Sequence, residues 1–168
     1  MDIILEELTA GLPDTRQLAR IAIRLLVAML LGAVVGIQRE QTGKPAGMRT
    51  HMLVALGAAL FVLAAVEAGM TSDDLSRVIQ GLATGIGFIG GGAILKLSEE
   101  REIQGLTTAA GIWMTAAMGV AAGLGRIGMA LMSALLTWFI LAVIGRAEHR
   151  ISARRTARDT PEMRGEAQ

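Results

Sequence analysis

The chain has 168 residues, of which 52% are hydrophobic and only 18% are charged, and its net charge is +1. A soluble domain of this size needs more charged surface, so the composition excludes an ordinary soluble protein and favours one that lies in a lipid bilayer. The absence of cysteine also excludes disulfides, thiolate metal sites and thiol catalysis.

Five apolar stretches follow one another along the chain, each about 18–20 residues long, the length that a helix needs to cross ~30 Å of hydrocarbon. They predict an all-α integral membrane protein, a bundle of about five transmembrane helices with glycine-rich packing. Asp14 and Thr15, which follow Pro13, are placed to cap the first helix. The predicted helices cover residues 18–37, 51–69, 78–97, 106–123 and 127–145, in a transmembrane domain of 18–145 that follows an external segment of 1–17.

The basic residues predict how this bundle is oriented. With five spans, the first loop, the third loop and the C-terminal tail share one side, which holds most of the 16 lysines and arginines. The positive-inside rule therefore places the N-terminus outside and the C-terminus in the cytoplasm of a bacterium, across its inner membrane. The basic cytoplasmic tail of residues 146–168 repeats arginine at steps of four from Arg146 to Arg158, as expected of a stripe that lies on anionic membrane lipid.

Several charges are expected near the outer side of the membrane. Arg24 lies one turn inside the first span, where it either snorkels to the outer interface or pairs with Glu67 near the end of the second span. Asp73 and Asp74 are expected to form a solvated turn, with a weak attraction for a divalent cation as the alternative. His51, at the entry of the second span, is expected to be an interfacial histidine.

The first loop brings charges close to two helix ends. Arg39 and Glu40 end the first predicted helix, and Arg49 and Thr50 lead into the second. One interpretation is positive-inside anchoring by snorkelling arginines. The other is an inner-face ionic cluster that closes or gates the bundle, because an arginine–carboxylate pair at the rim of the bilayer is stronger than a surface pair.

The third apolar stretch is rich in glycine. Gly85, Gly87 and Gly90 spell a dinucleotide fingerprint, but that motif works between a strand and a helix, and here it lies inside an apolar span. Glycines four residues apart share a helix face and allow close helix contact, which also favours a homo-oligomer. A broken helix whose carbonyls line a polar path is the alternative. The glycines assigned to packing are Gly81, Gly85, Gly87, Gly90, Gly91 and Gly92.

The third loop ends with Gly105, followed after one residue by Thr107 and Thr108. Either hydroxyl is able to cap the fourth helix by accepting from its free amides. A hydroxyl-lined inner vestibule is the alternative interpretation. The sequence has no HExxH, no Walker lysine motif and no Ser/His/Asp set, so no catalytic site, metal site or cofactor is predicted.

Several motifs together resemble one known family. They are Leu31–Gly36, Arg39-Glu40, Gly47–Thr50, Leu53–Gly57, Gly85–Ile94 and Gly105–Trp113. In this order they resemble the MgtC/SapB family of bacterial inner-membrane proteins, in a short form without the soluble C-terminal domain. Gln38 departs from the family pattern, which often has glutamate there.

The resemblance implies a multi-pass inner-membrane protein linked to adaptation to magnesium limitation and, in pathogens, to virulence. Some members are implicated in restraining the ATP synthase, and magnesium transport has been suggested for the family. Two hypotheses follow: a regulatory membrane protein, or a small Mg²⁺ transporter or channel. An enzyme is not expected. The expected partners are membrane lipid, further copies of the chain and a larger membrane protein, with no nucleic acid.

Overall fold

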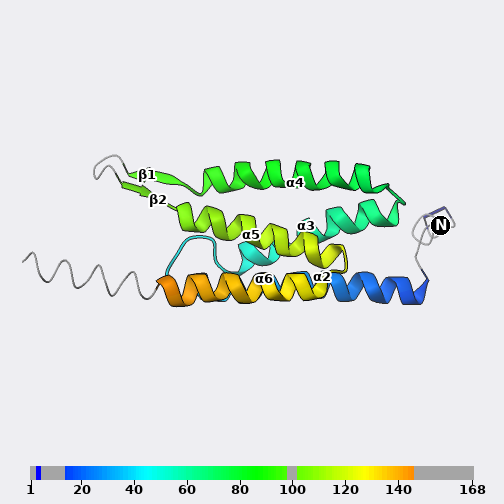
Figure 1. The fold of residues 1–168 in the computed structure, drawn as a ribbon, viewed down its shortest axis with the longest axis horizontal. Coiled ribbons are helices and arrows are strands. Elements are labelled where there is room, and N and C mark those ends of the chain that lie inside the picture. Colours follow the sequence, from blue (N-terminus) through cyan, green and yellow to red (C-terminus); the bar gives the residue numbers. More distant parts are fainter. Residues whose placement is uncertain (1–2, 5–13, 98–101, 146–168) are drawn as a thin grey trace, which may run out of the picture.

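The computed structural model describes residues 3–4, 14–97 and 102–145 of the chain. Long helices dominate these residues, as the sequence predicted (Figure 1). The predicted tail of 146–168 and most of the external segment lie outside the described residues. The helices are α2 (Thr15–Gln41), α3 (Met48–Glu67), α4 (Ser72–Gly92), α5 (Leu106–Gly123) and α6 (Ile127–Phe139), the last continued by the π-helical segment η1 (Ile140–Ile144).

The helix ends follow from local capping groups. Asp14 caps α2 as predicted, because its side chain accepts a hydrogen bond from the Gln17 amide at 2.6 Å. Thr71 caps α4 in the same way, accepting from the Asp74 amide at 3.3 Å. For this reason α4 begins at Ser72, well before the predicted start at residue 78.

The C-terminal end of α4 corrects the predicted third span, which was drawn to residue 97. The helix ends at Gly92, after three successive glycines that are poor helix formers. The chain continues as strand β1 (Leu95–Leu97), which pairs antiparallel with β2 (Glu102–Gln104), so that Leu95 lies opposite Gln104. The alternative of a broken helix is also wrong, because α4 runs without interruption through its glycines.

Four helical segments are long and apolar enough to cross a membrane: α2, α3, α5 and the continuous run Ile127–Ile144 of α6 and η1. The remaining long helix, α4, does not meet that standard by composition. Its first turns carry Asp73, Asp74 and Arg77, and much of the rest is glycine. The protein is therefore a membrane protein, and its described residues contain four strongly apolar helical segments and a more polar, glycine-rich helix.

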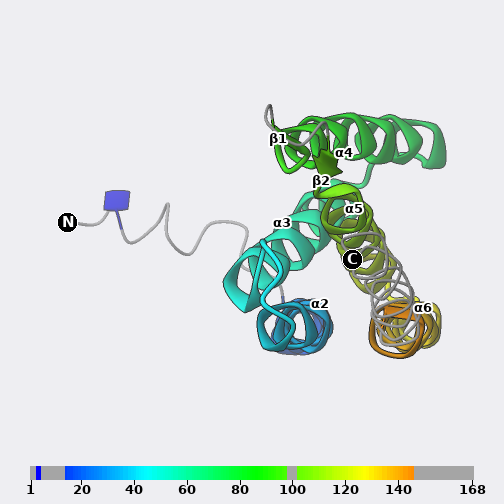
Figure 2. The same ribbon diagram turned by 90° about the vertical axis from the view of Figure 1, so that its left-hand side faces the viewer.

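The bundle is arranged around α5. Helix α3 packs mainly against α2 and α5, and α6 lies against α5 and α2. Helix α4 lies to one side of these four and touches α5 and, less extensively, α3 (Figures 1 and 2). One face of α4 therefore has none of the described helices beside it.

The core is made mostly of small residues, so the helix backbones approach closely. Gly32 and Gly36 of α2 lie on α3: a Cβ at Gly32 would come within 2.5 Å of the His51 carbonyl oxygen, and one at Gly36 would strike the Met48 Cα. More than half of the buried hydrophobic residues are alanines. Such small-residue contacts are the usual way in which helices associate in lipid.

Helix α5 meets α3 in the same manner. A Cβ at Gly119 would strike the Ala55 carbonyl oxygen, and one at Gly123 would come within 2.8 Å of the Ala59 carbonyl oxygen. Both glycines are buried. The close contacts within the chain thus use glycines four apart on α2 and on α5, and not those of the third predicted span.

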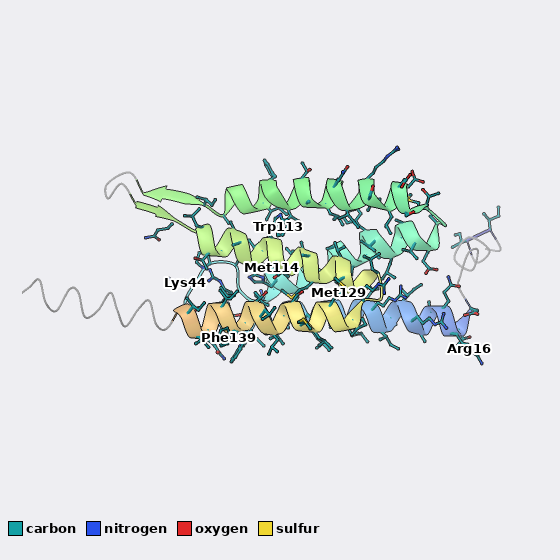
Figure 3. All side chains as sticks on the ribbon, in the orientation of Figure 1. Arg16, Lys44, Trp113, Met114, Met129 and Phe139 are labelled. Atoms are coloured by element: carbon teal, nitrogen blue, oxygen red, sulfur yellow. The ribbon has the colours of Figure 1, made fainter. Side chains whose placement is uncertain are left out.

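The outer surface of the bundle is apolar, as a lipid-facing surface must be. Large side chains such as Phe61 and Leu135 are about two-thirds exposed, at 63% and 66%. Phe139 projects from α6 away from the other helices, while Arg16 and Lys44 lie at opposite ends of the bundle (Figure 3). The end that carries the loop of residues 42–47 and the β1–β2 hairpin is called the hairpin end below (Figure 1).

Candidate functional site: a buried polar layer at the hairpin end

Arg39 is the most unusual residue of the described core. It lies in the last turn of α2, and only 3% of it is exposed. Its Nη2 group donates a hydrogen bond to the Thr108 hydroxyl of α5, while Nε has no partner. Within the part of the chain that the structure describes, no carboxylate pairs with this guanidinium. A positive charge is therefore buried beside a neutral hydroxyl.

His51 forms the second part of this layer. It is fully buried in the first turn of α3, and its Nδ1 lies 2.8 Å from the Thr115 hydroxyl of α5. That hydroxyl also donates to the Gly111 carbonyl at 2.8 Å, which favours the tautomer whose Nδ1 donates to the Thr115 oxygen. Nε2 is buried and has no hydrogen bond of good geometry among the described residues. The sequence analysis expected an interfacial histidine, and the structure places His51 inside the bundle core.

Gln38 extends the layer towards α6. Its side chain is buried, and Nε2 donates to the Leu141 carbonyl at 3.1 Å. Leu141 belongs to the π-helical segment η1, where the hydrogen bonds of a regular α-helix are replaced by the wider spacing of a π-helix. The Gln38 Oε1 atom is buried without a partner, like Arg39 Nε and His51 Nε2. Three buried polar atoms without partners at one end of a bundle mark this layer as a candidate site.

Small residues bring these side chains together. Gly32 and Gly36 let α3 approach α2, so that His51 lies close to the helix that carries Arg39. Gly111 of α5 also faces the imidazole: a Cβ there would lie 3.6 Å from His51 Cε1, an ordinary contact distance. The polar layer therefore depends on the same close approach of backbones that holds the bundle together.

The predicted ionic cluster is divided by the structure. Arg39 turns inward, whereas Glu40 and Arg49 are exposed and Thr50 is half-buried. Glu40 Oε2 accepts from the Met48 amide at 3.3 Å, at the start of α3. No ion pair joins these charges in the described residues, so Glu40 holds the loop while Arg39 belongs to the core.

The residues at the end of the third loop form neither the predicted threonine cap nor the predicted inner vestibule. The N-cap residue of α5 is Gly105, which has φ +94° and no side chain with which to cap the helix. Thr107 is exposed, and the Thr108 hydroxyl is buried against Arg39, so neither threonine acts as the cap. Nor does Thr108 line an open vestibule, since only 2% of it is exposed.

The glycines of α4 are mostly free of contacts within this chain. A Cβ at Gly90 would meet the Ala109 side chain of α5 at 3.5 Å. At the other five glycines predicted to pack, nothing lies within 4 Å of such an atom; these are Gly81, Gly85, Gly87, Gly91 and Gly92. The predicted close contact is therefore not made inside the described chain.

Among the described residues, Arg24 and Glu67 do not pair with each other, so the alternative of an ion pair between them is wrong. Arg24 Nη1 donates to the Gly123 carbonyl at 3.0 Å, and the Glu67 carboxylate accepts from Gln17. Asp74 accepts from the Thr71 hydroxyl at 2.7 Å and lies 4.0 Å from Arg77. Among the described residues, no three His, Asp or Glu side chains are placed to hold a metal ion.

With the fold and the polar layer described, comparison with known proteins decides the family. A family model described as the MgtC family matches residues 25–150. The chain belongs to the MgtC family. Its matched region includes all the helices described above except the first turns of α2.

Curated relatives agree with membership of the MgtC family. The chain is 44% identical to Protein SrpB of Synechococcus elongatus over 139 residues, which cover 76% of each protein. It is 36% identical to the Putative magnesium transporter YhiD of Escherichia coli, covering 79% of this chain and 64% of YhiD. It is 38% identical to Protein MgtC of Salmonella typhimurium, covering 77% of this chain and 54% of MgtC. No solved structure shows a significant match.

Sequence reasoning missed His51 and Thr115 as site residues. The signal for close packing was present in Gly32 and Gly36, four residues apart, but the glycine run of α4 drew the prediction instead. Nothing in the sequence pairs residues on different helices. Only the tertiary structure brings Arg39 to Thr108.

Proposed function

We propose that the chain is a regulatory inner-membrane protein, not an enzyme, that acts by helix contact with another membrane protein during adaptation to magnesium limitation. The observation that carries this proposal is the uncovered face of α4. Five of its glycines have open space beside them, and the helix packs on α5 through buried residues such as Ile86 and Gly90. Glycine faces of this kind let a second backbone approach closely in lipid.

The structure also has an apolar groove on the side of α4 that faces α5. It lies between α4 and α5, has a volume of about 150 Å³, and includes Ile79, Leu82 and Trp113 in its lining. Figure 3 shows Trp113 on the side of α5 that faces α4. A partner helix on α4 would gain apolar contact here as well as backbone contact. Further copies of this chain and a larger membrane protein both offer such a helix.

Transport of Mg²⁺ is the second candidate function, because the relative YhiD is named a putative magnesium transporter. The buried polar residues of the described core argue against a path through this bundle. They are Gln38, Arg39, His51, Thr108, Thr115 and Thr137, and none is a carboxylate. Mg²⁺ binds through oxygen ligands and usually needs carboxylates, and the buried guanidinium repels it.

The test of the regulatory proposal is a substitution on the open face of α4. Gly85→Leu has space for its side chain and should raise helix propensity by up to about 1 kcal/mol, so it should not weaken α4 itself. We expect normal accumulation of the variant but loss of growth at low Mg²⁺ in a strain that depends on this protein. Gly128→Leu makes the same change at an open, exposed glycine of α6 and should be tolerated.

Two results would contradict the proposal. If Gly85→Leu supports growth as well as the parent does, the α4 face is not the functional contact. If the purified protein in liposomes carries Mg²⁺ faster than empty liposomes, transport replaces regulation as the leading function.

A further inference from the structure

The end of the bundle opposite the hairpin end holds a polar cavity between α2 and α3. Its volume is about 460 Å³, within the range of ~300–1,000 Å³ that is usual for small-molecule sites. Arg16, Arg20 and Arg24 line it from α2, and Glu67 lines it from α3. The arginines are four residues apart, so they lie on one face of the helix. One cavity therefore collects three positive charges beside a carboxylate.

The three guanidinium groups have no acidic partner among the described residues. Arg24 is half-buried, and its Nη1 donates to the Gly123 carbonyl of α5 at 3.0 Å, which holds this side chain in place. Arg16 and Arg20 are exposed and make no hydrogen bond with a described residue. Like charges on one helix face repel one another, so an anion in the cavity would be stabilised by all three.

The acidic side chains of the cavity are held by Gln17. The Asp14 carboxylate accepts from the Gln17 backbone amide, and the Glu67 carboxylate accepts from the Gln17 side-chain amide. An ionised carboxylate has about four acceptor positions, so Glu67 is able to accept further hydrogen bonds from a ligand. The cavity therefore suits a ligand that carries both a negative and a positive group.

The length of α2 places this cavity at the surface of the membrane. Its 27 residues span about 40 Å at ~1.5 Å per residue, whereas the hydrocarbon core is only ~30 Å thick. The uncharged part of α2 runs from Leu25 to Gln38. Arg16 and Arg20 therefore lie beyond it, at the level of the lipid head groups.

We propose that this cavity binds a phosphoethanolamine group. The guanidinium groups of Arg16, Arg20 and Arg24 donate to the phosphate oxygens, and Glu67 accepts from the ammonium group. Arginine suits phosphate because its planar set of N–H donors matches the arrangement of the oxygens. None of the lining residues belongs to α4, so the site is separate from the face that carries the proposed function, and each is tested separately.

The same group occurs in membrane phosphatidylethanolamine and in soluble glycerophosphoethanolamine, so the experiment has an arm for each. In the first, the full chain is purified in an uncharged detergent, and native mass spectrometry measures its affinity for phosphatidylethanolamine, phosphatidylcholine and phosphatidylglycerol. In the second, glycerophosphoethanolamine is titrated into the same preparation by calorimetry. Binding in the first arm alone identifies a lipid ligand, and comparable affinity in the second identifies a soluble one.

Phosphatidylethanolamine should bind more tightly than the other two lipids. The quaternary ammonium of phosphatidylcholine has no N–H to donate to Glu67, and phosphatidylglycerol has no ammonium group. Glu67→Gln keeps the side-chain shape and an acceptor for Gln17, and it should remove the preference for phosphatidylethanolamine over phosphatidylcholine.

Arg20→Gln should weaken binding of phosphatidylethanolamine roughly tenfold, the size expected for losing a charge-assisted hydrogen bond. Arg77→Gln is the matched control, because it removes the same charge from an exposed position at the same end of the bundle but outside the cavity (Figure 1). It should bind like the parent.

Equal affinity of the parent, Arg20→Gln and Arg77→Gln for phosphatidylethanolamine would overturn the site. So would a parent that binds neither ligand, or that binds phosphatidylethanolamine no more tightly than the other two lipids. Retention of the full preference in Glu67→Gln would overturn the assignment of the ammonium group to Glu67. If Arg20→Gln fails to accumulate, Arg16→Gln decides in its place.

Discussion

His51 of α3 and Thr115 of α5 are joined in the core, with Nδ1 of the imidazole 2.8 Å from the threonine hydroxyl. Neither side chain has measurable exposure, so water cannot replace this bond. The same hydroxyl donates onward to the Gly111 carbonyl. One threonine therefore orients the histidine and favours a proton on its Nδ1.

Loss of this hydroxyl should destabilise the bundle. Thr115→Val keeps the shape but leaves Nδ1 unpaired, so we expect a loss of about 1–3 kcal/mol in the free energy of unfolding. Thermal unfolding in detergent, followed by tryptophan fluorescence, measures it. Thr115→Ser should retain most of the stability. Thr84→Val is the control, because that exposed hydroxyl bonds only its own helix at Gln80. Equal unfolding temperatures of all three variants would show that the His51–Thr115 hydrogen bond does not stabilise the bundle.

Close contact between α5 and α3 gives a second prediction. Gly119→Ala places a methyl group against the Ala55 carbonyl, and we expect a loss of about 1–3 kcal/mol as the backbones are forced apart. Gly91→Ala on α4 adds the same methyl group in open space and should be neutral or slightly stabilising. Thermal unfolding of both variants in detergent measures the difference in stability. If Gly91→Ala proved the more damaging change, the assignment of the contact glycines would be wrong.

Two glycines with positive φ provide a third, matched comparison. Gly43 has φ +65° with open space around it, whereas Gly105 has φ +94° and touches the Ala93 carbonyl. Gly43→Ala should cost only the backbone strain, about 1–2 kcal/mol. Gly105→Ala adds a backbone clash and should cost more, with a lower yield of folded protein. Similar stability of the two variants would show that the α4–β1 connection yields to the added methyl group.

The proposed orientation is tested with single cysteines, since the chain has none of its own. Arg16 and Lys44 are exposed at opposite ends of the bundle (Figure 3). With the N-terminus outside, a membrane-impermeant thiol reagent should label Arg16→Cys in spheroplasts, and Lys44→Cys only after lysis. The reverse labelling pattern would show the opposite orientation, and the positive-inside rule would then have failed for this chain.

The sequence predicted the helices well and their ends less well. The predicted range of 106–123 matches α5, because an apolar run without charged residues is bounded by Gly105 and Gly125, both with positive φ. The predicted third helix began and ended too late in the chain. Hydropathy detects the apolar part of a helix, so it gives little weight to a polar helix start such as Thr71 to Asp74.

The site was predicted only in part. Arg39 and Thr108 were both chosen, but for separate clusters, and His51 was assigned to the membrane interface. Charge patterns along a chain show which residues lie near a helix end, but they do not show which face each side chain takes. Consecutive residues on a helix point in different directions, which is why Arg39 enters the core while Glu40 stays outside.

By itself, the sequence determined the class of protein, the helical bundle and the family motifs, because these depend on composition and on short-range order along the chain. The tertiary structure decided which glycines carry contacts and which polar groups meet. Gly119 lies against Ala55, while Gly85 has no described residue beside it. Both glycines allow close approach equally well, so only the position of a second backbone distinguishes a packed glycine from an open one.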